Sequence, residues 1–210
     1  MTNTLRLQPE SVKFVFINME LMKFYQAYNF THLSEGFYSN KPLNIDPGGE
    51  TVYGISRVYH PNLDIWAIVD EAKTKKNFPA NLLQNKQLLT KAQVFFLSEF
   101  WLKIRCPEID DNRIQLHLYD CAVNCGQGTS VMFLQQCLGV VADGLLGSIT
   151  LNAYKNADKD ELFNKFIEIN KTYYYKKVQE NPAKKVNLNG WLERIDRCTK
   201  YALSVVNDNN

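Results

Sequence analysis

Apolar residues recur at helical spacing over most of the chain, which predicts a protein made mainly of α-helices. From about Ser11 to Leu33, long aliphatic and aromatic side chains return every three or four residues, and this spacing places them on one face of a helix. Similar patterns recur at about 63–75, 90–103, 111–122, 129–139, 158–178 and 189–206. We therefore expect about seven helices.

Capping residues predict where several of these helices begin. Thr90 followed by Gln93 has the form of a capping box, in which the two side chains satisfy the first free amides of a helix. Asp111 is placed to cap the next helix, and Asp158 with Glu161 to open a later one. Glycines that suit helix ends follow at Gly126 and Gly139.

The helical pattern breaks between Gly36 and Tyr59. This stretch contains four glycines and two prolines together with several Asn and Ser residues, a composition typical of turns. A short β-hairpin is compatible with the segment from Thr51 to Ser56. In a helical protein, a long loop of this kind is where function is sought first.

Composition and charge exclude several classes of protein. The 210 residues are 45% hydrophobic and carry a formal net charge of +2, so a folded core is expected and global disorder is not. No block of Lys and Arg forms a stripe, and we expect no nucleic-acid partner. No stretch reaches the roughly 18 apolar residues of a membrane span, so no membrane insertion is expected.

The N-terminal segment is interpreted as a core helix and not as a signal peptide. Its apolar run is interrupted by Lys13 and Glu20, and it lacks a basic start and a small-residue cleavage site. We therefore expect synthesis in the cytoplasm without a recognisable signal peptide. The five cysteines and three histidines show no metal-ligand spacing, so neither a metal nor a cofactor is expected. The oligomeric state stays open.

Two carboxylates near the loop are candidates for acid–base chemistry. Glu35 follows the first predicted helix and stands beside Phe37, whose ring favours a raised pKa by partial burial. Asp46 lies in a Gly-rich stretch where a carboxyl group stays ionised. Glycoside hydrolysis uses such a pair, one as a protonated acid and one as a carboxylate. The alternative is that both residues belong to ordinary turn chemistry.

Several ordered motifs resemble those of the glycoside hydrolase family 108 N-acetylmuramidases, which include phage endolysins and bacterial secretion-activator muramidases. The motifs are SEGFYSN (34–40), DPGGETVYGIS (46–56), FLSEFWLK (96–103) and LYDCAVNCG (118–126). FLQQCLGVVADGLLGSITL (133–151) and NGWLERIDR (189–197) are similar to the predicted peptidoglycan-binding region that follows in this family. The resemblance covers nearly the whole chain.

The resemblance implies a lysozyme-like helical fold with a long Gly/Pro-rich active-site loop. It implies a catalytic lobe over 1–117 and a helical peptidoglycan-binding lobe over 118–210, packed as one compact unit. The activity implied is cleavage of the β-1,4 bond between N-acetylmuramic acid and N-acetylglucosamine in the glycan strands of the bacterial cell wall. The family's catalytic glutamate falls on Glu35. The sequence departs from the family pattern at Phe37, where a second glycine is usual.

The remaining candidates belong to the same expected site. Asp46 is the hypothesised second catalytic group, and Thr51 is expected to hold a water molecule by its hydroxyl. Tyr38, Tyr53 and Trp101 are expected to stack on sugar rings, and Asp120 and Asn124 to line the cleft. For Trp101 the alternative is a place in the core, and for Asn124 it is a structural hydrogen bond.

Two other functions stay open at this point. One is a protein that binds peptidoglycan, or assists secretion, without cutting the wall. The other is a glycosidase that acts on a different amino-sugar polymer such as chitin.

Overall fold

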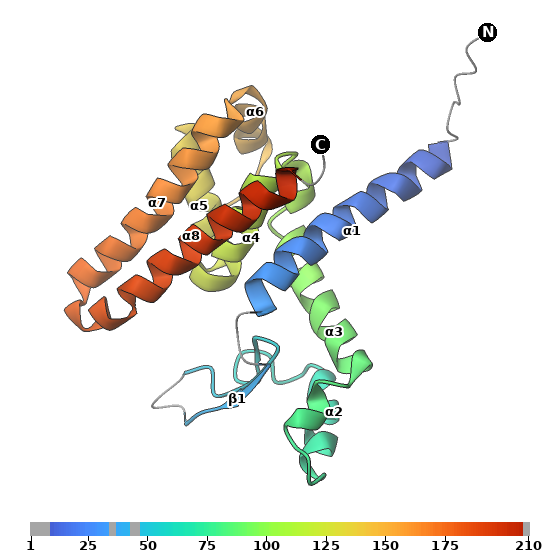
Figure 1. Cartoon of the computed structure of the whole chain (residues 1–210). Helices are drawn as coiled ribbons and strands as arrows, with labels where there is room; N and C mark the ends of the chain where they lie inside the picture. The colour runs from blue at the N-terminus through green and yellow to red at the C-terminus, as the bar shows by residue number, and fades with distance from the viewer. Residues whose placement is uncertain (1–8, 34–36, 43–46, 208–210) are drawn as a thin grey trace. The chain divides into compact units, whose positions relative to one another are not determined.

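The computed structural model describes residues 9–33, 37–42 and 47–207, which form a mainly α-helical protein with one small sheet (Figure 1). This confirms the predicted fold class. The α-helices are α1 (Pro9–Leu33), α2 (Ile65–Lys73), α3 (Lys86–Phe96), α4 (Asn112–Cys125), α5 (Gln127–Leu138), α6 (Ser148–Asn156), α7 (Lys159–Glu180) and α8 (Lys185–Asn207). Among the described residues, no helix is long and apolar enough to cross a membrane.

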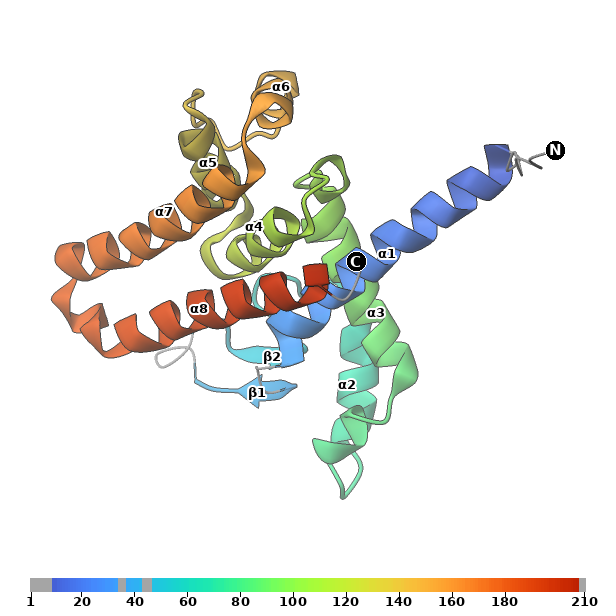
Figure 2. The same cartoon turned by 45° about the horizontal axis from the view of Figure 1, so that its top comes forward.

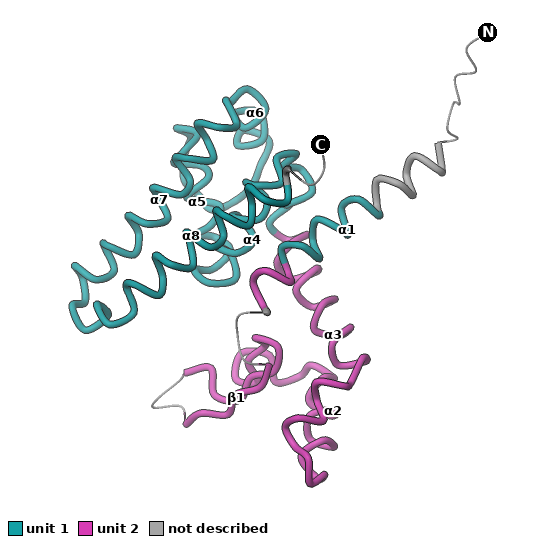
Figure 3. Tube along the Cα trace, viewed as in Figure 1, with its two compact units in different colours: residues 1–27, 104–210 teal, residues 28–103 magenta. Residues whose placement is uncertain are grey.

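The chain divides into two compact units, one of which is discontinuous in sequence (Figure 3). Unit 1 combines residues 1–27 with residues 104–210, whereas unit 2 is the continuous segment 28–103. The first division falls inside α1. The boundary expected between the two lobes, at residues 117 and 118, falls inside α4, so it does not coincide with either division.

Unit 1 is built around α4, which packs against α5, α7 and α8 (Figure 2). Every residue from Ile114 to Ala122 is buried, as expected for a helix with neighbours on all sides. Its buried polar side chains have partners. Gln115 donates to the backbone oxygen of Cys106 at 2.9 Å, and Asp120 accepts from Arg194 at 2.8 Å.

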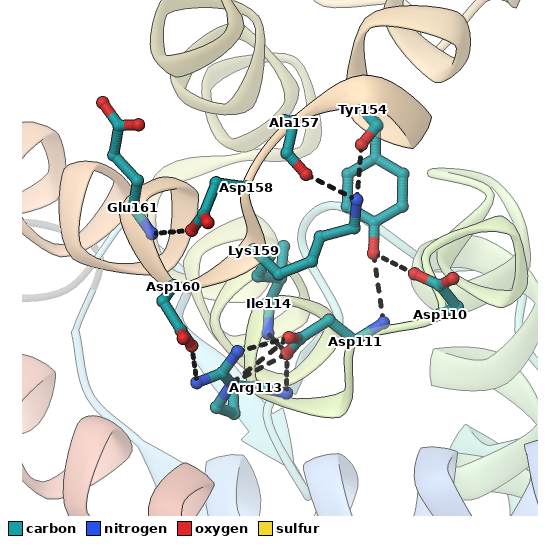
Figure 4. A network of polar contacts seen from close by, with 10 residues as sticks. All are labelled: Asp110, Asp111, Arg113, Ile114, Tyr154, Ala157, Asp158, Lys159, Asp160 and Glu161. Carbon is teal, nitrogen blue, oxygen red and sulfur yellow. Dashed lines mark hydrogen bonds and ion pairs between the residues drawn. The ribbon is translucent and has the colours of Figure 1, made fainter.

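A polar network joins the start of α4 to the region where α6 ends and α7 begins (Figure 4). Asp111 caps α4 by accepting from the amides of Arg113 and Ile114. The Arg113 guanidinium also pairs with Asp160 at 2.6 Å, and the backbone amide of Asp111 donates to the hydroxyl of Tyr154 at 3.1 Å. These contacts fix α6 and α7 to α4 within unit 1.

Unit 2 contains a three-stranded antiparallel sheet in the order β1-β2-β3, with strands Tyr38–Asn40, Glu50–Val52 and Ile55–Ser56. The chain continues through α2, the 3₁₀ turn η1 (Ala80–Leu82), α3 and the π-helical segment η2 (Leu97–Leu102). Fully buried side chains from each layer form the core, among them Val52, Ile55, Val69, Leu88, Phe96 and Trp101.

Some predicted boundaries are confirmed and others are wrong. Asp158 caps α7 by accepting from the amide of Glu161 at 2.8 Å, as predicted. The capping box at Thr90 does not form, because Asn85 caps α3 instead and the helix begins at Lys86. Two further differences are α6, which the sequence pattern did not predict, and α8, which begins at Lys185 and not near residue 189.

Candidate active site

The predicted hairpin at Thr51–Ser56 is present and turns through only two residues. Val52 pairs with Ile55, and the connecting residues Tyr53 and Gly54 have φ angles of 48° and 81°. Two successive positive φ angles define a type I′ turn, which matches the twist of antiparallel strands. The positive φ favours glycine at position 54, and a Cβ atom there would also lie in tight contact, 3.3 Å from Nδ1 of His32.

The sheet presents a row of hydroxyl groups on one face. Thr51 in the central strand is paired with Ser39 on one side and with Ser56 on the other, and directly paired residues point to the same face. Ser56 Oγ donates to the backbone oxygen of Gly48 at 2.7 Å. This hydrogen bond holds the residues just before β2 against β3. Because alternate residues face opposite ways, Val52 enters the core from the other face.

Glu50 begins the central strand of the sheet and is held by one hydrogen bond and two ion pairs. Its carboxylate accepts from Tyr38 Oη at 2.9 Å and lies 2.6 Å from Lys73 Nζ and 2.9 Å from Arg57 Nε. The Glu50 side chain is only 11% exposed. Burial, and then the hydrogen bond to Glu50, raise the pKa of Tyr38 to about 12. The Tyr38 ring packs edge-on against Phe78 with centroids 4.8 Å apart, so its position is fixed at both ends.

Arg57 extends this cluster to α2. Its guanidinium donates to both carboxylate oxygens of Asp70, at 3.1 and 2.7 Å, and lies 4.6 Å from the centroid of the Trp66 ring. Bidentate pairing and stacking on an aromatic face both favour Arg over Lys. The hydrogen bond from Arg57 lowers the pKa of Asp70.

An open cavity of about 340 Å³ lies beside Glu50 and Arg57. It is lined by Asn40, Lys41, Pro42, Gly49, Glu50, Arg57 and Val58. Its wall therefore combines an exposed amine, a guanidinium and an amide, groups that donate hydrogen bonds to carboxylate and hydroxyl oxygens. Among the described residues, no group of His, Cys, Asp and Glu side chains is placed to hold a metal ion.

Three of the predicted site residues lie in or beside the sheet: Tyr38 in β1, Thr51 in β2 and Tyr53 in the turn between β2 and β3. Tyr38 is paired with Val52 and therefore lies on the face opposite Thr51. Glu35 and Asp46 lie outside the described residues.

The other three predicted residues lie in different surroundings. Trp101 is 1% exposed, which places its ring in the core of unit 2 and leaves no face for a sugar. Asp120 and Asn124 belong to α4 in unit 1. Asp120 is paired with Arg194, and the Asn124 amide donates to the backbone oxygen of Asp120 at 2.6 Å, which is the structural alternative for Asn124.

Sequence reasoning did not identify the cluster of Glu50, Arg57 and Lys73. The three residues come from β2, from the segment after β3 and from α2, so no local motif connects them. The charges of these residues do not by themselves indicate a cluster, because exposed charged residues are common on protein surfaces.

Comparisons with known proteins agree with the layout inferred from the motifs. Residues 28–126 match the family described as glycosyl hydrolase 108, and residues 129–196 match the family described as a predicted peptidoglycan domain. No curated protein matches the sequence. The fold is similar to the structure of SagA from Brucella abortus, with a TM-score of 0.59 and 23% sequence identity over 91% of this chain and 95% of that one. Residues 28–126 therefore form a glycosyl hydrolase 108 region, and a predicted peptidoglycan domain follows it in the chain.

Proposed function

We propose that the protein is a lysozyme-type N-acetylmuramidase that cleaves the β-1,4 bond between N-acetylmuramic acid and N-acetylglucosamine. The observation that carries the proposal is the glycosyl hydrolase 108 match over residues 28–126. This segment contains both candidate carboxylates and the hairpin with its row of hydroxyl groups. The predicted peptidoglycan domain that follows supports the same polymer as substrate.

In this proposal Glu35 is the general acid that protonates the oxygen of the leaving sugar. A positioned acid of this kind contributes about 10²–10⁴-fold to the rate. Asp46 is the second carboxylate, which either activates water or stabilises the positive charge that develops on the sugar ring. Thr51 positions a water molecule by its hydroxyl, and Tyr38 and Tyr53 contact the apolar faces of sugar rings.

The contacts of Thr51 support its proposed role, and those of Tyr38 fix its ring on the opposite face of the sheet. No described residue forms a side-chain hydrogen bond with Thr51, so its hydroxyl is available to water or substrate. The Tyr38 hydroxyl is committed to Glu50, which holds the ring in one orientation. Preorganised side chains of this kind lose little entropy when a substrate binds.

The proposal is tested by mass spectrometry of the fragments released from purified peptidoglycan. Wild type is expected to release fragments with reducing N-acetylmuramic acid ends, and Glu35→Gln is expected to reduce their rate of formation by at least 10²-fold. Glu168→Gln, which alters an exposed glutamate on α7, is the matched control and should keep full activity. Cleavage at the wild-type rate by Glu35→Gln would refute the assignment.

A second candidate function is wall binding without cleavage. The predicted peptidoglycan domain over residues 129–196 favours it, because such a domain needs no hydrolase to act as an anchor. Sedimentation of the protein with intact wall sacculi, without any new reducing ends, would select this function over the first.

A further inference from the structure

Four lysines stand on the two sides of the turn where α7 meets α8, in two pairs along the sequence. We call residues 173–191 the α7–α8 tip. Lys176 and Lys177 stand in the last turns of α7, which ends at Glu180, and Lys184 and Lys185 lead into α8 through the short turn η4 (Pro182–Lys184). At 1.5 Å of rise per residue, Lys176 lies only about 6 Å along the axis from the end of α7. Figures 1 and 2 show both helices meeting at this tight connection.

The positive charge of the tip is not compensated locally. Glu180 is the only acidic residue in 173–191, and none of the four lysines forms an ion pair with another described residue. Two lysines that precede the tip on α7 are paired. Lys165 pairs with Glu161 at 2.6 Å and Lys171 with Asp196 at 2.9 Å. The tip therefore carries four lysines without an ion pair among the described residues, whereas Lys165 and Lys171 earlier on α7 are paired.

Two of these charges are placed where helix electrostatics disfavour them. The first residues of a helix carry a partial positive charge, so cations there are destabilising. Lys184 nevertheless ends η4 immediately before α8, Lys185 is the first residue of α8, and the first turn of α8 contains no acidic residue. Folding alone gives no reason for this arrangement, whereas the binding of an anion would relieve the repulsion.

Aromatic rings accompany the lysines. The amine of Lys177 lies 4.6 Å from the centroid of the Tyr173 ring. Trp191 stacks on Tyr174 with centroids 4.8 Å apart and an interplanar angle of 23°, and the side chain of Tyr175 is 49% exposed. Amines beside aromatic faces suit a polymer that carries both carboxylates and sugar rings.

We propose that the α7–α8 tip binds the carboxylates of peptidoglycan stem peptides and so anchors the protein to the wall. The proposal rests on the function proposed above in taking peptidoglycan as the target, but it does not require cleavage. An anionic membrane is a poorer match, because Tyr175 and Val186 are the only large hydrophobic side chains that are exposed among the described residues of the tip. A surface of this composition has little to insert among lipid chains.

The test compares two variants with the same change in net charge, both in a Glu35→Gln background that leaves the wall uncut. The tip variant carries Lys→Gln changes at 176, 177, 184 and 185. The control carries Lys155→Gln, Lys165→Gln, Arg197→Gln and Lys200→Gln, which alter exposed positions of the same unit. Each protein is sedimented with three probes: purified sacculi, sacculi with amidated carboxyl groups, and phosphatidylglycerol vesicles. Circular dichroism checks that both variants are folded.

The tip variant is expected to bind sacculi at least tenfold more weakly than the control, equivalent to about 1.4 kcal/mol. Amidation should remove the difference between the two variants, and a rise in salt should narrow it because exposed charges are screened. Equal binding of both variants to untreated sacculi would overturn the proposal. Loss of vesicle binding with unchanged sacculus binding would also overturn it, in favour of a membrane. Failure of wild type to cleave the wall would leave this result unaffected.

Discussion

Replacement of His117 should remove a specific part of the acid sensitivity of unit 1. The His117 side chain is 2% exposed and lies against the rings of Phe163 and Phe166, with centroids 5.4 and 6.3 Å away. Its Nε2 is 3.2 Å from Oγ1 of Thr199. Burial lowers the pKa of His117 to about 4, even though the nearby Asp120 acts in the opposite direction.

The magnitude follows from the difference between the folded and unfolded pKa values. In an unfolded chain the pKa of histidine is about 6.5. As pH falls from 6.5 to 4, the unfolded state takes up a proton that the folded state does not, so folding stability is lost across this window. Each pH unit corresponds to about 1.4 kcal/mol, so the total loss approaches roughly 3 kcal/mol by pH 4. Above pH 6.5 this histidine has no effect on the slope.

The assay compares wild type with His117→Gln, whose amide reaches Thr199 but does not titrate. Urea unfolding is followed at several pH values between 7.5 and 4 by pulse labelling of the buried thiols of Cys106, Cys121 and Cys198 with a dithiodipyridine. All five cysteines belong to unit 1, so the labelling reports on that unit alone. Carboxylates titrate alike in both proteins, and their contribution cancels in the difference.

At pH 7.5 the variant should be the less stable protein, and the gap should shrink by about 3 kcal/mol as pH falls to 4. A gap that stays constant over the whole range would refute the reasoning, because it would mean that His117 is charged in the folded protein as readily as in the unfolded one.

Three further predictions concern stability. Gly54→Ala should lower the unfolding free energy of unit 2 by about 1–2 kcal/mol because Gly54 has a left-handed φ. Gly190→Ala in α8 should raise the unfolding free energy of unit 1 by up to about 1 kcal/mol. Urea unfolding that shows a gain for Gly54→Ala or a loss for Gly190→Ala would contradict this. Glu50→Gln should destabilise unit 2 by about 1–3 kcal/mol, because it leaves the clustered cations without a carboxylate. Asp64→Asn, which breaks only the exposed pair with Lys91, should change stability by less than about 1 kcal/mol. An equal loss of stability in Glu50→Gln and Asp64→Asn would contradict the expectation that the more buried carboxylate contributes more.

Short-range chemistry made part of this fold predictable from the sequence. Asp111 and Asp158 were correctly predicted as helix caps, because capping depends on an oxygen and on amides two or three residues away. The hairpin was predictable from Gly54 and the alternation around it. The helix α3 was placed too late because Asn85 is followed by the polar Lys86 and Gln87, so the apolar periodicity starts only after the cap. The short, largely polar sequence of α6 gives little periodicity to detect.

The candidate site was harder to predict because its contacts are long-range. Tyr38 and Thr51 were identified from local motifs, but the residues that hold Glu50, namely Tyr38, Arg57 and Lys73, come from separate elements. The segment that includes Trp101 carries apolar residues on several faces. Periodicity therefore did not indicate which ring faces the core, and packing around η2 decides that Trp101 is buried.

The discontinuity of unit 1 has a consequence for biosynthesis. The first helix leaves the ribosome early, yet its partners in unit 1 are made much later: Phe24 meets the ring of Tyr119 at 6.0 Å, and Glu20 lies 3.5 Å from Gln115, which is 95 residues further along the chain. Unit 2 is complete once residue 103 has emerged, whereas unit 1 must wait for its C-terminal helices. Non-local contacts of this kind slow folding, and they leave the nascent α1 with its apolar side chains exposed. During synthesis the helix is therefore a natural client for chaperones that shield hydrophobic segments.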